Sequence, residues 1–146
     1  MDLPAQIFSI ANLLAMLAWL VLLATLPFAS IRPKANRVAT IAVPALLAAA
    51  YLGLLLGSGP APEGGGFGSI AEVRMLFADD AMLTAGWIHY LAFDLFVGGW
   101  IARDAADRAM PLWLLPPCLI LCFLLGPTGL LAYMLIRTLV RRRAAA

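Results

Sequence analysis

Long apolar runs, separated by short polar or glycine- and proline-rich segments, dominate the chain. Four such runs cover about residues 3–28, 38–57, 81–102 and 112–140. Because a helix rises ~1.5 Å per residue, ~20 apolar residues are enough to cross the ~30 Å hydrocarbon core of a bilayer. The pattern predicts an all-α polytopic membrane protein, organised as a four-helix transmembrane bundle.

The segments between the runs predict connections outside the membrane. Residues 32–37, which include three basic side chains and a proline, are expected to form a short loop, and residues 58–68 form a Gly/Pro linker. Ser69 and Glu72 then have the spacing of a capping box, and apolar residues follow at helical spacing. We therefore expect a short amphipathic interfacial helix over about residues 69–79, in the second loop.

The fourth run contains a break signal near its middle, Gly126-Pro127-Thr128-Gly129. Glycine and proline together favour either a kink or a complete interruption of a helix. The basic residues concern the same run. Three of them follow the first run and none precedes it, which favours an N-terminus outside, but a four-helix bundle places five Lys and Arg residues on each side of the membrane. A re-entrant half-helix before or within this run would remove that conflict.

The composition agrees with a membrane protein of a single domain, residues 1–146. The hydrophobic fraction is 64%, the mean hydropathy is +0.95 and the net charge is +2. There is no basic stripe interleaved with aromatic residues, the pattern that indicates nucleic-acid binding. The first run has no basic segment before it, so we expect a retained helix rather than a signal peptide. Cys118 and Cys122 fit small, buried apolar residues.

The third run contains the residues best suited to chemistry. It holds the only histidine, His89, and a carboxyl, Asp94, deep within an apolar stretch. An ionisable side chain at the centre of a membrane helix costs about 3 kcal/mol, so such residues generally serve a function. At ~100° per residue, His89 and Asp94 point ~140° apart on a helix, so we expect each to reach a different neighbour.

Acid–base chemistry is the function that these side chains favour. A carboxyl in a low-dielectric medium favours its neutral form, and histidine titrates near neutral pH, so Asp94 and His89 can both exchange protons. Tyr90, one turn from Asp94, completes the predicted catalytic set. With a single histidine in the chain, no metal site is predicted and no cofactor is expected. The alternative is structural, in which Asp94 only stabilises packing. Its partner would then be a polar residue of another segment: Asn12, Tyr133 or Arg103.

Aromatic side chains are dense in the third run, and they favour a flat, apolar ligand. The predicted ligand-binding residues are Trp87, Phe93, Phe96 and Trp100, together with Asn12 of the first run. Two other interpretations stay open. Tryptophans near the ends of a span also form interfacial belts, and Asn12 also fits a hydrogen bond to a neighbouring helix.

Three stretches of the sequence form a set: Gly86-Trp87-x-His89-x-Leu91-Ala92-Phe93-Asp94-Leu95-Phe96-Val97-Gly98 followed by Asp104, Pro117-Cys118-Leu119, and Gly126-Pro127-x-Gly129-Leu130-Leu131. This set resembles the abscisic-acid-deficient-four-like family, whose plant members are associated with neoxanthin synthesis. That conversion opens an epoxide of violaxanthin and removes a proton to form an allene. The resemblance implies a small polytopic membrane protein acting on xanthophylls. Asp94 and His89 fit the acid and the base that such a step needs.

Two functions are therefore expected. The first is a carotenoid-modifying isomerase, and the alternative is a non-catalytic carotenoid- or lipid-binding accessory protein. The expected partners are membrane lipids and a carotenoid-like apolar ligand. A homodimer through Gly98-Gly99 or the Ala-rich second run, or association with carotenoid-pathway enzymes, is also compatible with the sequence. The short chain, rich in Ala, Leu and Gly, suggests a bacterial member located in the inner membrane.

Overall fold

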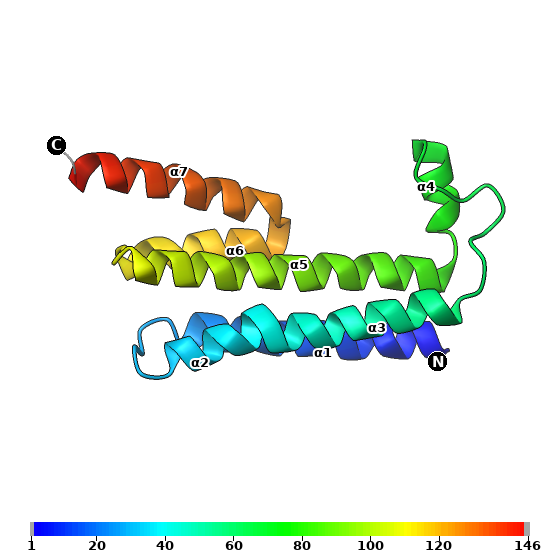
Figure 1. Cartoon of the computed structure of the whole chain (residues 1–146), viewed down its shortest axis with the longest axis horizontal. Helices are drawn as coiled ribbons and strands as arrows, with labels where there is room; N and C mark the ends of the chain where they lie inside the picture. The colour runs from blue at the N-terminus through cyan, green and yellow to red at the C-terminus, as the bar shows by residue number, and fades with distance from the viewer. Residues whose placement is uncertain (1, 145–146) are drawn as a thin grey trace.

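The structure, a computed structural model, describes residues 2–144, the last four of them by their backbone alone. All regular structure in this range is helical, and Figure 1 shows that most of the helices lie along one long axis. The elements in chain order are α1 (Leu3–Ala24), α2 (Arg32–Arg37), a π-helical turn η1 (Val38–Ala42), α3 (Val43–Gly57), α4 (Ile70–Leu76), α5 (Asp80–Asp107), a 3-10 turn η2 (Leu112–Leu114), α6 (Leu115–Leu125) and α7 (Pro127–Ala144).

Within the described residues, three helical segments are long and apolar enough to cross a bilayer. They are α1, α5 and the continuous stretch Arg32–Gly57, which joins α2, η1 and α3. The all-α class is confirmed, and a short helix, α4, is present where one was predicted. Residues 32–37 are helical and not a loop, because Pro33 lies in the first turn, where its missing N–H is not needed.

The predicted four-helix bundle is wrong, because the fourth run folds as two shorter helices. α6 and α7 meet at a turn through Gly126, whose φ of +47° lies in the region that favours glycine. Pro127 then begins α7, a position at which proline is well tolerated. In Figure 1, α6 lies beside α5, and α7 returns toward the end from which α6 started. The fourth run is therefore a helical hairpin.

The turn of the hairpin lies against the middle of α5. A Cβ atom placed on Gly126 would be 2.8 Å from Oδ1 of Asp94, and Asp94 is midway between Asp80 and Asp107, the ends of α5. α6 has 11 residues, so it is ~16 Å long, about half of the ~30 Å hydrocarbon core. This is the re-entrant arrangement that the sequence left open.

Small residues allow the two helices of the hairpin to pack closely. Gly129 of α7 lies directly against the backbone of α6 at Cys118 and Cys122. Both cysteines are buried and free, which confirms their interpretation as small apolar residues. Any side chain at position 129 would therefore separate the two helices.

The Gly98-Gly99 pair of α5 packs inside the chain. Gly98 lies against the indole ring of Trp19, and Gly99 lies against the side chain of Thr40. Nδ2 of Asn36 donates to the Gly99 carbonyl at 2.6 Å, and Oγ1 of Thr40 donates to the Asn36 carbonyl at 2.7 Å. The glycines thus hold α1, α2 and η1 against α5, and they are not a free surface for a homodimer.

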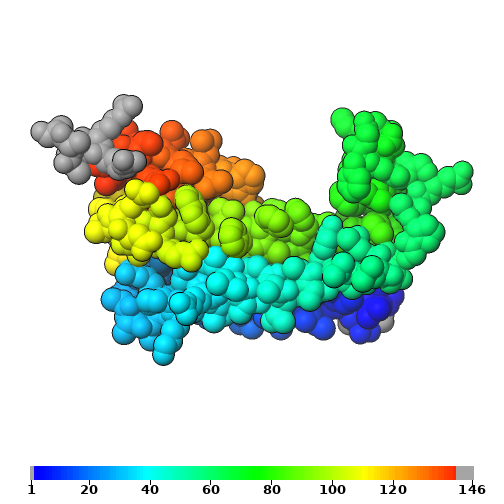
Figure 2. Space-filling model, viewed as in Figure 1, coloured from blue at the N-terminus to red at the C-terminus, as the bar shows by residue number. Residues whose placement is uncertain are grey.

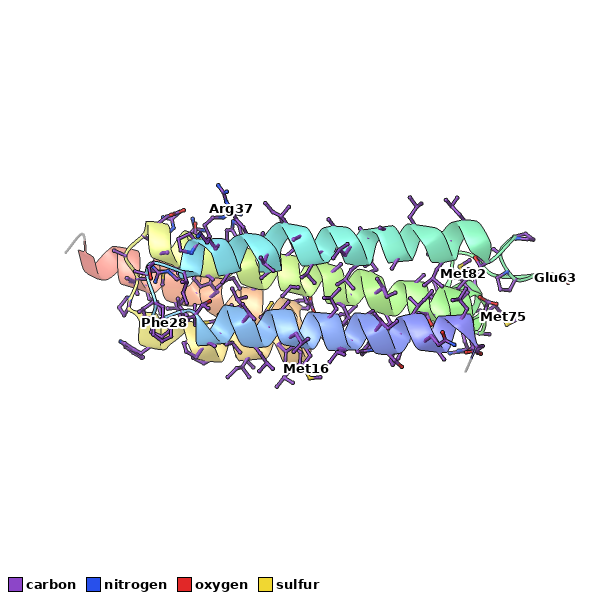
Figure 3. All side chains as sticks on the ribbon, turned by 90° about the horizontal axis from the view of Figure 1, so that it is seen from below. Met16, Phe28, Arg37, Glu63, Met75 and Met82 are labelled. Atoms are coloured by element: carbon purple, nitrogen blue, oxygen red, sulfur yellow. The ribbon has the colours of Figure 1, made fainter. Side chains whose placement is uncertain are left out.

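The hairpin gathers positive charge at one end of the molecule, because α7 ends near the α2 end and not near α4 (Figure 1). Nine of the ten Lys and Arg residues belong to segments at this end: Arg32, Lys34, Arg37, Arg103, Arg108, Arg137, Arg141, Arg142 and Arg143. The tenth, Arg74, is in α4 at the other end. Figure 3 shows Arg37 at one end and Glu63, Met75 and Met82 at the other. The positive-inside rule therefore predicts that the α2 end faces the cytoplasm.

We expect Gly129→Ala to destabilise the hairpin, because the added methyl group would meet the backbone of Cys122 and Cys118. The expected loss is about 1–3 kcal/mol, measured as a lower Tm of the purified protein in detergent. Gly53→Ala is the matched control, since a Cβ atom there has nothing within 4 Å. Equal Tm values for the two variants would contradict the close α6–α7 packing.

The orientation can be tested with single cysteines and a C-terminal tag in intact bacterial cells. Glu63→Cys should react with a membrane-impermeant maleimide from outside, and Lys34→Cys should react only after permeabilisation. The C-terminal tag should also be reachable only after permeabilisation, because α7 returns to the α2 end. A tag that is accessible from the same side as Glu63→Cys would show a fourth span and refute the hairpin.

Candidate functional site

The predicted site residues lie on three sides of α5. Trp87, Tyr90 and Asp94 face α1 and the hairpin. His89, Phe93 and Phe96 lie on the side that packs near α3. Trp100 faces α7. Asp94 and His89 thus point away from each other, as their spacing on a helix predicts.

Asp94 faces the turn of the hairpin from the middle of α5. Its Oδ2 atom is buried and has no hydrogen-bond partner among the described residues. A purely structural role would pair the carboxyl with Asn12, Tyr133 or Arg103, and none of them bonds this atom. Asn12 instead accepts a hydrogen bond from Nε1 of Trp87 at 3.0 Å. The side chain that interacts with the Asp94 carboxyl is Tyr90 of the same helix, and a buried carboxyl oxygen without a partner calls for an explanation.

Tyr90 is one helical turn from Asp94 and lies on the same side of α5. Its hydroxyl donates to the carbonyl of Phe123 at 3.5 Å, near the end of α6. The ring of Trp87, one turn further along, is 5.3 Å from that of Tyr90. Trp87 and Tyr90 therefore lie on the α4 side of the Asp94 carboxyl. The hydrogen bond between Trp87 and Asn12 connects α5 to α1, as one interpretation of the sequence predicted.

Figure 2 shows that the molecule is hollowed over the first half of α5, between α4 and the hairpin. The hairpin turn touches Asp94, and Tyr90 reaches the last residues of α6. Both side chains are half-buried.

The α3 side of α5 is an apolar track lined by aromatic rings. The His89 ring stacks on Phe93 with centroids 4.5 Å apart, and the Tyr51 ring of α3 is 6.0 Å from His89. Phe93 and Phe96 then line a groove of about 410 Å³ against α3 and η1. His89 also lines a second cavity of about 250 Å³ that reaches Phe77, next to α4.

These two cavities follow one face of α5, from Met82 to Phe96. At ~1.5 Å per residue this face is ~21 Å long. The groove ends at η1, where Thr40 lies four residues before Pro44. In an α-helix the proline ring would clash with the Thr40 carbonyl, and the wider π turn relieves that clash. The face of α5 from Met82 to Phe96 is lined mainly by apolar and aromatic side chains.

Trp100 belongs to a separate network that the sequence did not predict. Oδ2 of Asp104 accepts a hydrogen bond from the Tyr133 hydroxyl at 2.5 Å and from Nε of Arg108 at 2.8 Å, and it lies 3.2 Å from Nε of Arg137. Trp100 packs edge-on against Tyr133 at 5.8 Å. This network fastens α7 to α5, so Trp100 has a packing role here. The only signal in the sequence was Asp104 four residues before Arg108.

No three His, Cys, Asp or Glu side chains converge within the described part of the chain. The sequence also lacks a second histidine with which His89 could share an ion.

The sequence was compared with models of known protein families, with curated proteins and with solved structures. The family model described as ABA DEFICIENT 4-like matches residues 6–133, from α1 into α7. The match includes α5, the hairpin turn and both faces described above. Searches of curated proteins and of solved structures gave no match. Because the family model covers most of the chain, this protein belongs to the ABA DEFICIENT 4-like family.

Proposed function

We propose that this protein is a membrane isomerase that rearranges a xanthophyll-type carotenoid by acid–base catalysis, with Asp94 as the proton-exchanging group. The observation that supports this most is the unpartnered Oδ2 of Asp94, held at mid-height in the apolar part of the molecule beside the hairpin turn. The family name, which refers to abscisic acid deficiency, agrees with a carotenoid-related role.

A single carboxyl can perform both proton transfers of an epoxide rearrangement. Protonated Asp94 donates its proton to the epoxide oxygen while the C–O bond breaks, and the electron pair of that bond stays on oxygen. The resulting carboxylate then accepts a proton from the carbon skeleton, and the C–H electrons form the new double bond. Substrate and product are isomers and the acid is regenerated, so no oxidant or cofactor is needed.

Tyr90 supports this chemistry from one turn away, where its hydroxyl can hold the substrate oxygen or the carboxyl in position. His89 cannot act on the same atom, because it points to the α3 side of α5. In the proposed mechanism His89 therefore belongs to the aromatic track with Phe93 and Phe96, where it contacts the long apolar part of a ligand.

We place the protein in a bacterial inner membrane, which its apolar spans and its Ala-, Leu- and Gly-rich composition support.

A second candidate function is pigment binding without chemistry. The observation in its favour is the groove of about 410 Å³ beside Phe93 and Phe96, whose surface is almost entirely apolar. Such a groove can hold a carotenoid for another enzyme and does not require Asp94. Both functions use this groove and only the isomerase requires Asp94, so substitution of Asp94 separates them.

Asp94→Asn tests catalysis. In carotenoid-producing cells it should reduce formation of the new pigment by at least ~10²-fold, the usual contribution of a general acid–base group, while bound pigment persists. The readout is chromatography of extracts, normalised to protein level. Asp80→Asn, an exposed carboxyl at the start of the same helix, should retain full activity. Undiminished product with Asp94→Asn would refute the proposal.

Phe93→Ala and Phe96→Ala test the groove. Each should weaken retention of the pigment by the purified protein by about tenfold, because a stacked ring contributes about 0.5–1.5 kcal/mol beyond its buried area. Phe28→Ala is the matched control, since Phe28 is 56% exposed and Phe93 59%, but Phe28 lies outside the groove. If all three variants retain pigment equally, the groove is not the binding site.

A further inference from the structure

A polar cavity lies between α2 and α5, at the basic end of the molecule and beyond the end of the apolar groove. Its volume is about 440 Å³, within the range of small-molecule sites, which is about 300–1,000 Å³. Arg32, Asn36 and Arg37 line it from α2, and Arg103 and Asp107 line it from α5. Neither the acid–base site nor the aromatic track uses any of these residues.

The cavity has an excess of positive charge. Three arginines and one carboxylate line it, so its formal charge is 3 − 1 = +2. Among the described side chains, the arginine–carboxylate ion pairs are those of Arg108 and Arg137 with Asp104, so the three arginines of the cavity are not neutralised by an ion pair. Arg32 also donates to the Leu26 carbonyl at 3.2 Å. A planar guanidinium binds a phosphate through two parallel hydrogen bonds, which makes a phosphate group the matching ligand.

The walls of the cavity are held in place by buried contacts. Asn36 is buried and donates to the Gly99 carbonyl at 2.6 Å, which fixes α2 against α5. Thr40, one turn on, donates to Oδ1 of Asn36 at 3.2 Å as well as to its carbonyl. The arginines of α2 therefore face Arg103 across the cavity because of the fold of the chain.

The position of the cavity identifies the source of the phosphate. Arg32 begins the span Arg32–Gly57, and Arg103 and Asp107 lie at the end of the span Asp80–Asp107. The cavity is thus at the level where spanning helices leave the hydrocarbon core, the level of lipid head groups, and Figure 3 shows Arg37 at this end. Basic pockets between membrane helices on the cytoplasmic side bind anionic head groups.

We propose that this cavity binds the phosphate of an anionic phospholipid head group, with Arg32, Arg37 and Arg103 as its charged ligands. The proposal does not depend on the reaction at Asp94. The basic end of the protein then has a specific lipid site, in addition to a general attraction to the negative membrane surface.

The test is binding of fluorescent phosphatidylglycerol to the full-length purified protein in neutral detergent, with fluorescent phosphatidylcholine as the reference lipid. Wild-type protein should prefer phosphatidylglycerol. The double variant Arg37→Gln/Arg103→Gln should bind phosphatidylglycerol about tenfold more weakly or worse, because each basic side chain near the head group adds to affinity. Arg74→Gln, in α4 at the opposite end, removes a charge without touching the cavity and should bind normally.

A second variant tests whether weaker lipid binding could result from loss of folding. Asp107→Asn changes the charge of the lining from +2 to +3 and should tighten binding of phosphatidylglycerol, an effect that misfolding cannot produce. The proposal is overturned if the double variant binds like Arg74→Gln, if Asp107→Asn weakens binding, or if the wild type shows no preference between the lipids. Displacement of the lipid by inorganic phosphate at low concentration would also overturn it, since the ligand would then be a soluble phosphate.

Discussion

A turn inside a bilayer has to be covered by protein, because lipid offers no hydrogen-bond partners to backbone groups that leave a helix. The break at Gly126-Pro127 creates such a turn, and the rest of the structure follows from how it is covered. The Gly126 N–H donates to the Cys122 carbonyl and the Gly129 N–H to the Gly126 carbonyl, which satisfies part of the turn. The turn itself lies against Asp94, at the centre of α5.

The same turn determines the distribution of charge. Because α7 reverses direction, Tyr133 and Arg137 meet Asp104 near the end of α5 and join the hairpin to the spans. The reversal also returns the C-terminal basic residues to the end that holds α2. A straight fourth span would have placed them at the opposite end and divided the charge equally. The orientation, and the setting of the basic cavity among head groups, both follow from this return.

α5 separates two kinds of surface. On the hairpin side a carboxyl lies in apolar surroundings beside a tyrosine, which suits proton transfer. On the α3 side His89, Phe93 and Phe96 follow a track without a buried charge, which suits the body of a long apolar ligand. His89 lies among the aromatic rings of this track.

The sequence by itself determined three of the four predicted spans, the α4 helix and the separation of His89 from Asp94, because hydropathy and helical periodicity are properties of consecutive residues. It also marked Gly126-Pro127 as a break. Tertiary structure alone decided that the break is a hairpin and that Asn12 bonds Trp87. It also decided that Asp104 and not Asp94 pairs with Tyr133, and that Arg37 and Arg103 line one cavity. Each of these depends on contacts between residues far apart in the chain, and the local pattern contains no information about which distant partner a side chain will meet.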